Sequence, residues 1–315
     1  MPRHHPIPPW RCLAVAVALC LAFAAGCADK RPPTAVRQPD APTSSSPEDV
    51  IRQTSPTIAS GNAPAASYQE RGEAYYRLGQ FELAQKDFEK AQSSGSPSAE
   101  SLYDLGAAAY MRQDYDKALK FFSDAVAMDG GMGRAYNNRG VTYFALGQYE
   151  NALADFNTAA RLGGPSEGAA LFNRALTYQS MRDLDRAMAD YDRITAADPG
   201  NVAARNNKAD ILITLRRFDE AAAVLDAAIA ASPSDAELYF NRALAREALG
   251  QYPTAMADYD RAVRLRSNFA EAYRNRGVLH LRLQQNKEGC ADLALACRFG
   301  QCAQTQKAKN FGMCQ

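Results

Sequence analysis

The chain of 315 residues contains very little histidine and lacks the short motifs around which many enzymes are built. Its three histidines are His4, His5 and His280, and the first two precede the apolar core of an apparent signal peptide. No P-loop, GxSxG, HExxH or CxxCH string is present. His280 is expected to be a packing residue, and the carboxylates fall at repeating positions. The sequence therefore predicts a protein that is not an enzyme and that binds no cofactor, small-molecule substrate or metal ion.

The chain also lacks an excess of charge of either sign. It has 36 Lys and Arg against 35 Asp and Glu, which gives a formal net charge of +1, and no basic block stands out. Proteins that bind nucleic acid present a basic patch or stripe to the phosphates. A nucleic-acid partner is therefore not expected.

The N-terminus has the features of an export signal over residues 1–26. Two arginines precede an apolar run over residues 12–25, which is shorter than the roughly 20 residues of a membrane-spanning helix. The run ends in LAFAAGC, which resembles a bacterial lipobox, and this resemblance implies that Cys27 becomes the lipidated first residue of the mature protein. Ala24 stands where such boxes prefer leucine. Ordinary signal cleavage, which would leave a soluble periplasmic or secreted protein, stays the alternative.

Residues 27–64 are predicted to be the lipidated cysteine followed by a disordered tether. The segment is rich in Pro, Ser, Thr and Ala and has no sustained apolar period, so it cannot bury a core. About 36 such residues have an r.m.s. reach on the order of 35 Å. A lipid at Cys27 would then hold the folded part near a membrane without fixing its orientation.

No cysteine occurs between Cys27 and the last part of the chain, where four are found. An even set in an exported chain indicates two disulfides. Cys290 and Cys297 would lie about 10 Å apart along one helix, too far to bond directly. A helix stop at Gly300 followed by a short returning helix predicts the pairs Cys297–Cys302 and Cys290–Cys314. A zinc site is the rival, but the chain has no CxxC and no adjacent histidine.

Internal repetition is the strongest feature of the sequence. Five asparagines recur at steps of 35, 34, 34 and 34 residues: Asn138, Asn173, Asn207, Asn241 and Asn275. Each period contains a small residue, a second small residue twelve positions later, and a bulky residue four positions after that. This spacing fits two antiparallel helices per unit, stacked because one unit cannot bury its own apolar face. Seven units begin near residues 65, 99, 133, 168, 202, 236 and 270.

These residues and spacings match the tetratricopeptide repeat (TPR) family over residues 65–300. The resemblance implies an all-α solenoid of about seven repeats that forms a right-handed superhelix, with the first helix of each repeat lining a concave groove. Residues 301–315 would form a disulfide-stapled cap.

Two charged positions vary together between the repeats. In five units an arginine precedes the first small residue and an aspartate precedes the bulky residue: Arg71 with Asp87, Arg139 with Asp155, Arg174 with Asp190, Arg242 with Asp258, and Arg276 with Asp292. The second unit has Leu105 and Phe121 instead. We therefore predict an Arg–Asp ion pair between the two helices that belongs to the scaffold.

The five asparagines resemble the ladder in the TPR superhelix of O-GlcNAc transferases, which holds extended polypeptide by its main chain. The resemblance implies a peptide-binding role for all five, since an amide offers both a donor and an acceptor. Hydrogen bonds between helices of adjacent units are the alternative. Aromatic residues predicted to line the same groove are Tyr76, Tyr110, Phe144, Tyr103, Phe172 and Phe240. Packing in the core competes equally with that interpretation.

Together these features predict a non-enzymatic adaptor lipoprotein of the bacterial envelope. It would bind an extended peptide or a helix of an envelope protein in its groove. Ala28 rather than Asp follows Cys27, which in the lipoproteins that it resembles favours the outer membrane, facing the periplasm. The rivals are a structural subunit of a pilus, secretin or outer-membrane assembly that uses the convex face or the ends, and a regulatory factor of a peptidoglycan hydrolase or protease.

Overall fold

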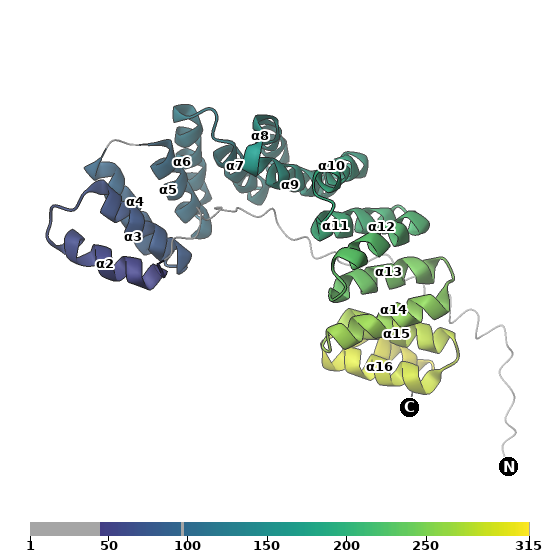
Figure 1. Ribbon diagram of the computed structural model, residues 1–315. Coiled ribbons are helices and arrows are strands. Elements are labelled where there is room, and N and C mark those ends of the chain that lie inside the picture. Colours follow the sequence, from purple (N-terminus) through teal and green to yellow (C-terminus); the bar gives the residue numbers. More distant parts are fainter. Residues whose placement is uncertain (1–44, 96–97, 315) are drawn as a thin grey trace, which may run out of the picture. The chain divides into compact units, whose positions relative to one another are not determined.

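The computed structural model describes residues 45–95 and 98–314 (Figure 1). Every regular element in these two stretches is a helix, which confirms the all-α prediction. The signal peptide, the lipobox and Cys27 lie outside the described residues. None of the described helices combines the length and the apolarity that a bilayer crossing requires.

The chain divides into two compact units, which meet in sequence between Ile194 and Thr195. The described N-terminal unit contains α2 (Pro47–Ala59), α3 (Ala65–Arg77), α4 (Phe81–Ser94), α5 (Ala99–Met111), α6 (Tyr115–Met128), α7 (Gly133–Ala145), α8 (Tyr149–Leu162), the short η2 (Gly164–Ser166), α9 (Glu167–Ser180) and most of α10 (Leu184–Ala197). The C-terminal unit contains α11 (Val202–Thr214), α12 (Phe218–Ala231), α13 (Ala236–Ala248), α14 (Tyr252–Leu265), α15 (Ala270–Arg282), α16 (Asn286–Arg298) and α17 (Ala303–Asn310). The helices from α3 to α16 form seven consecutive pairs, as the repeat predicts.

Close approach of the two helices in a pair depends on the small residue of the first helix. A Cβ atom added to Gly140 would lie 2.7 Å from a ring carbon of Phe156, closer than packed atoms allow. The first two repeats show the same contact, between Gly72 and Phe88 and between Gly106 and Phe122. Glycine is therefore needed in these repeats because the phenylalanine ring lies directly against the first helix.

The turn inside each pair uses a left-handed residue. Gly79, Gly147 and Gly250 adopt φ values of 73°, 72° and 74° there, as the LGQF and LGQY strings suggest. The other four repeats place a glutamine or an arginine in the same conformation: Gln113, Arg182, Arg216 and Gln284. These residues carry a steric penalty that glycine avoids, so the turn geometry is imposed by helix packing in those repeats.

Helix α2 corrects the prediction of a disordered tether over residues 27–64. Ser46 caps the helix by accepting a hydrogen bond from the Asp49 backbone N–H, and Pro47 occupies the first turn. Thr54 is 8% exposed, and Ser55 Oγ lies 3.4 Å from Arg71 Nη1. Ser123 makes the same contact with an arginine sixteen residues later, two repeats further on. Helix α2 therefore occupies the place of the second helix of a preceding repeat.

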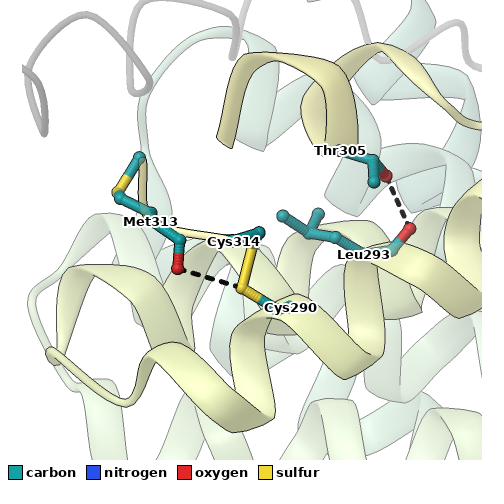
Figure 2. The surroundings of a disulfide bond; sticks show 5 residues. All are labelled: Cys290, Leu293, Thr305, Met313 and Cys314. Atoms are coloured by element: carbon teal, nitrogen blue, oxygen red, sulfur yellow. Dashed lines mark hydrogen bonds between the residues drawn. A yellow bond between two sulfur atoms is a disulfide. The ribbon is translucent and has the colours of Figure 1, made fainter. Parts of the chain in front are cut away.

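The C-terminal cap confirms both predicted disulfides. Cys290 bonds to Cys314 with 5.5 Å between their Cα atoms, and Cys297 bonds to Cys302 with 3.9 Å. Figure 2 shows the first bond beside the hydrogen bond of 2.7 Å that Thr305 Oγ1 donates to the carbonyl oxygen of Leu293. The sulfur of Cys290 also lies 3.2 Å from the Met313 carbonyl oxygen, a contact without a donated proton because disulfide sulfur carries none. Helix α17 is thus held on α16 by covalent and polar contacts.

Candidate functional site

The five predicted Arg–Asp pairs are present, and each is bidentate. In the third repeat, Arg139 Nε lies 2.8 Å from Asp155 Oδ2 and Nη2 lies 2.8 Å from Oδ1. The other four pairs have two N–O distances between 2.5 and 2.9 Å. Burial raises the pKa of Asp155, although the guanidinium of Arg139 opposes that shift. These arginines are part of the scaffold and are not available to a ligand.

The same arginines join each repeat to the helix before it. The Nη1 atom of each arginine donates to an oxygen on the preceding second helix: Ser55, Ser123, Asn157, Asp226 or Asp260. Each guanidinium therefore fixes three helices relative to one another. The sequence comparison predicted the pair inside the repeat but not this third contact.

The asparagines of the third and fourth repeats hold first helices together. Asn173 Nδ2 donates to Asn137 Oδ1 at 3.0 Å, which joins α9 to α7. Asn137 Nδ2 donates to Asn138 Oδ1 at 3.2 Å. Asn138 Nδ2 in turn donates to the Tyr103 hydroxyl at 3.1 Å, which joins α7 to α5. A chain of amide hydrogen bonds therefore crosses three successive repeats.

Burial corrects the predicted peptide contacts of three of these residues. Asn138 and Asn173 are each 1% exposed, and Tyr103 is 0% exposed. A peptide cannot reach these side chains in the described conformation. The alternative interpretation, hydrogen bonds between helices of adjacent units, describes Asn138 and Asn173, and Tyr103 is a core residue.

The asparagines of the last three repeats are less enclosed. Asn207, Asn241 and Asn275 are partly exposed. Asn241 Nδ2 donates to Asn206 Oδ1 at 2.8 Å, which joins α13 to α11. Within the described chain, the Asn206 amide NH₂ and the Asn241 amide oxygen make no further hydrogen bond. Asn275 Oδ1 accepts a hydrogen bond from Arg274 Nε at 3.0 Å, so this amide oxygen already has a partner within the chain.

The aromatic residues predicted to line the groove pack largely inside their own repeats. Tyr76, Tyr110 and Phe144 are half-buried, and their rings lie 5.2, 5.5 and 5.3 Å from the aromatic residue that begins the following helix. Phe172 and Phe240 likewise pack against the ring of a second-helix tyrosine, at 5.7 and 6.1 Å. The core-packing interpretation therefore accounts for most of this surface.

The residue type at the position of Tyr76, Tyr110 and Phe144 correlates with the type of the bulky residue on the second helix, twelve positions later. Where that residue is tyrosine, the position is polar: Tyr191 donates to Gln179 Oε1 at 2.6 Å, and Tyr259 donates to Glu247 Oε2 at 2.9 Å. Where the bulky residue is phenylalanine, the position is aromatic. The two positions are always twelve residues apart, so comparison of the repeats could have assigned these residues to the core.

Asp210 on α11 is the candidate site residue that the sequence analysis missed. It makes no hydrogen bond or ion pair with any part of the chain that the structure describes, and burial alone raises its pKa. Five other repeats have an apolar residue at this position: Ala107, Val141, Leu176, Leu244 and Val278. A carboxylate at a usually apolar position was the signal that could have found it.

The described residues bring together no group of three His, Cys, Asp or Glu side chains that could hold a metal ion. The candidate site is therefore a set of amides and one carboxylate on first helices. Such a set can pair with a polypeptide main chain and with a basic group.

Comparison with known families identifies the repeats. A family described as Tetratricopeptide repeat matches residues 70–133, 172–236, 206–269 and 240–300, and a second family of the same description matches residues 133–162. No curated protein matches the sequence.

Three solved structures of similar fold illustrate the architecture. A tetratricopeptide repeat protein from Parabacteroides merdae has 22% identity and a TM-score of 0.53, over 85% of this chain and 98% of that one. The C-terminal part of a TPR repeat-containing protein from Cytophaga hutchinsonii has 16% identity and a TM-score of 0.60, over 72% and 93%. Yeast Tom70 has 18% identity and a TM-score of 0.55, over 84% of this chain and 58% of that one. These identities support a shared fold only.

Proposed function

We propose that this chain, which belongs to the tetratricopeptide repeat family, is an envelope adaptor that binds an extended peptide along its first helices. Solenoids of this family are generally non-catalytic scaffolds for protein–protein interaction. The observation that carries this proposal is the Asn206–Asn241 pair. The pair leaves one amide donor and one amide acceptor without a partner in the described chain, on the first helices of two adjacent repeats. A peptide group needs one acceptor and one donor in return.

The envelope location rests on two features at opposite ends of the chain. The N-terminal sequence resembles a lipoprotein signal with Cys27 as the lipidated residue. The C-terminal cap contains two disulfides, which persist in oxidising compartments such as the periplasm. We place the protein on the outer membrane facing the periplasm, because Ala28 follows Cys27.

A second candidate is a structural subunit of an envelope assembly that uses the ends or the second-helix side of the array. The burial of Asn138 and Asn173 favours this candidate for the N-terminal unit, because a peptide cannot reach these two side chains. The two candidates differ in the residues on which partner binding depends.

Crosslinked affinity capture from an envelope extract tests the proposal. The wild-type chain is compared with an Asn206→Ala, Asn241→Ala double variant and with Asn286→Ala, which removes an exposed amide from α16. Equal helical circular dichroism must first show that all three are folded. Loss of the major partner from the double variant alone supports peptide binding at α11 and α13. An unchanged set of partners contradicts it and favours the structural subunit.

Labelling with radioactive palmitate tests the anchor separately. We expect label on the wild-type protein and none on a Cys27→Ala variant. If the wild-type protein carries no label, the lipoprotein part of the proposal is wrong while peptide binding stands.

A further inference from the structure

Three polar side chains of the fifth and sixth repeats lie on neighbouring helix faces. Asp210 follows Asn206 by four residues on α11, so both side chains lie on the same face of that helix. Asn206 is bonded to Asn241 of α13 at 2.8 Å. These residues form the Asn206–Asp210–Asn241 cluster, with one carboxylate, one amide NH₂ and one amide oxygen that have no partner among the described residues.

The carboxylate of Asp210 is partly exposed, unlike the buried carboxylates of Asp155 and Glu247, and it also differs from them in having no partner among the described residues. Burial also raises the pKa of Asp155, but this carboxylate has the Arg139 guanidinium as a partner. Glu247 has the Tyr259 hydroxyl at 2.9 Å and the Arg282 guanidinium at 3.4 Å. For Asp210, burial raises the pKa and no opposing contact is present. Charged groups that lose part of their hydration are normally paired, and the partial exposure of Asp210 leaves its carboxylate within reach of a ligand.

We propose that the Asn206–Asp210–Asn241 cluster is a subsite for a lysine or arginine side chain of an extended peptide. The carboxylate of Asp210 accepts charge-assisted hydrogen bonds from the basic group, which are roughly twice as strong as neutral ones. The NH₂ of Asn206 and the amide oxygen of Asn241 pair with the main chain next to that residue. This inference rests on the proposed function, because it names the chemistry of the peptide that binds there.

A metal ion is a poorer occupant of the same cluster. Calcium takes six to eight oxygen ligands, and magnesium demands octahedral coordination. The cluster offers one carboxylate and one amide oxygen that is not already bonded within it. An ammonium or guanidinium group needs only a few acceptors, which is what the cluster provides.

Selection from a phage library of random 12-residue peptides tests the subsite and does not require the natural partner to be identified. The full chain is used as wild type, Asp210→Asn, Asp210→Arg and Asp219→Asn. The last variant is the matched control, since it removes an exposed carboxylate from α12 of the same repeat. We expect lysine or arginine to be enriched at one peptide position with the wild type and the control. The preference should disappear with Asp210→Asn and change to aspartate or glutamate with Asp210→Arg.

The affinity of one selected peptide then measures directly the interaction between its basic residue and Asp210. Replacing its basic residue by norleucine should weaken binding to the wild type roughly tenfold, and should have no effect on binding to Asp210→Asn. Circular dichroism and melting curves confirm that each variant is folded. The isosteric Asp210→Asn variant keeps the test valid if Asp210→Arg does not fold.

The outcomes separate the subsite from the proposed function. Peptides that bind the wild type but show the same charge preference with Asp210→Asn would overturn the subsite and leave peptide binding intact. If no peptide is enriched on any of the four proteins, both the subsite and peptide binding at these helices are wrong.

Discussion

Replacing the Arg139–Asp155 ion pair by the apolar pair of the second repeat tests how the scaffold is stabilised. The second repeat has Leu105, which is 0% exposed, and Phe121, which packs against the buried cluster around Phe88. The fold therefore already contains both solutions at equivalent positions. We predict that the double variant Arg139→Leu, Asp155→Phe keeps the wild-type stability within about 1 kcal/mol, because well-packed apolar residues often replace a buried ion pair without loss.

Each single variant should be much less stable. Asp155→Phe leaves Arg139, whose side chain is 18% exposed, without two hydrogen bonds of 2.8 Å. Arg139→Leu leaves the carboxylate of Asp155, 7% exposed, without its cation. Breaking a buried pair costs about 3–5 kcal/mol of stability. For Asp155→Phe we expect a loss of about 3 kcal/mol, because water can partly solvate the guanidinium of Arg139. The coupling energy between the two substitutions should then be roughly 4 kcal/mol or more.

The pKa of Asp155 supports this expectation for the double variant. Burial raises that pKa even with Arg139 in contact, whereas the hydrogen bond with Asp155 raises the pKa of Arg139. Desolvation of the carboxylate therefore offsets part of what the pair contributes. We therefore expect the pair to specify the register of the helices, and the double variant tests whether it also adds net stability.

Urea unfolding of the full chain, followed by circular dichroism, gives the four stabilities of the cycle. The slopes of the transitions must agree between variants, because repeat arrays can unfold in parts. The reasoning is refuted if the double variant is destabilised by the sum of the two single effects. That result would mean that the ion pair itself is a net source of stability.

Three further predictions concern the C-terminal cap, the candidate site and the repeat core. Reducing the Cys290–Cys314 bond should lower the free energy of unfolding of the last repeat by about 3 kcal/mol, given a sequence separation of 24, and identical melting curves with and without reductant would contradict this. Asp210→Asn should raise the melting temperature at pH 7, since burial raises the pKa of Asp210; the gain should shrink as pH falls through the folded-state pKa and vanish below the unfolded-state value. Gly140→Ala should destabilise by about 1–3 kcal/mol in urea, because its Cβ would lie 2.7 Å from Phe156, and adding Phe156→Leu should recover much of the loss.

The repeat boundaries, the Arg–Asp pairs and the disulfides could be predicted from the sequence. Each depends on residues whose partner lies at a fixed spacing along the chain. Arg139 and Asp155 are sixteen residues apart, as in every repeat that has the pair, so joint gain and loss identifies the contact. The cysteine pairing followed from helix geometry and a glycine stop.

The depth of a repeated position could not be predicted from its period. Asn138 and Asn241 occupy the same position in their repeats, yet Asn138 is 1% exposed and Asn241 is partly exposed. The difference comes from neighbours in other repeats, such as the Tyr103 hydroxyl that Asn138 reaches. A period fixes the direction of a side chain from its own helix but not what the adjacent helix places there.

Helix α2 was missed for a different reason. Its composition resembles a linker, and Thr54 stands where α4 has Phe88, so the apolar pattern of a second helix is absent. The helix is instead specified by its cap at Ser46, a proline in the first turn, and packing on α3. Composition alone could not show that a neighbouring helix was present to support it.

The fifth repeat departs from the scaffold pattern at three positions, and the departures include the candidate site. It has Lys208 and Val224 where five repeats have the Arg–Asp pair, and Asp210 where five have an apolar residue. Elsewhere the buried polar groups are largely matched within the array, as arginine with aspartate or tyrosine with an acceptor. Positions that break a local rule without a compensating contact are expected at functional sites, where stability is given up for binding. Asp210 is such a position, and its unmatched charge, one helical turn from the Asn206 that binds Asn241, is the physical reason to look for the partner there.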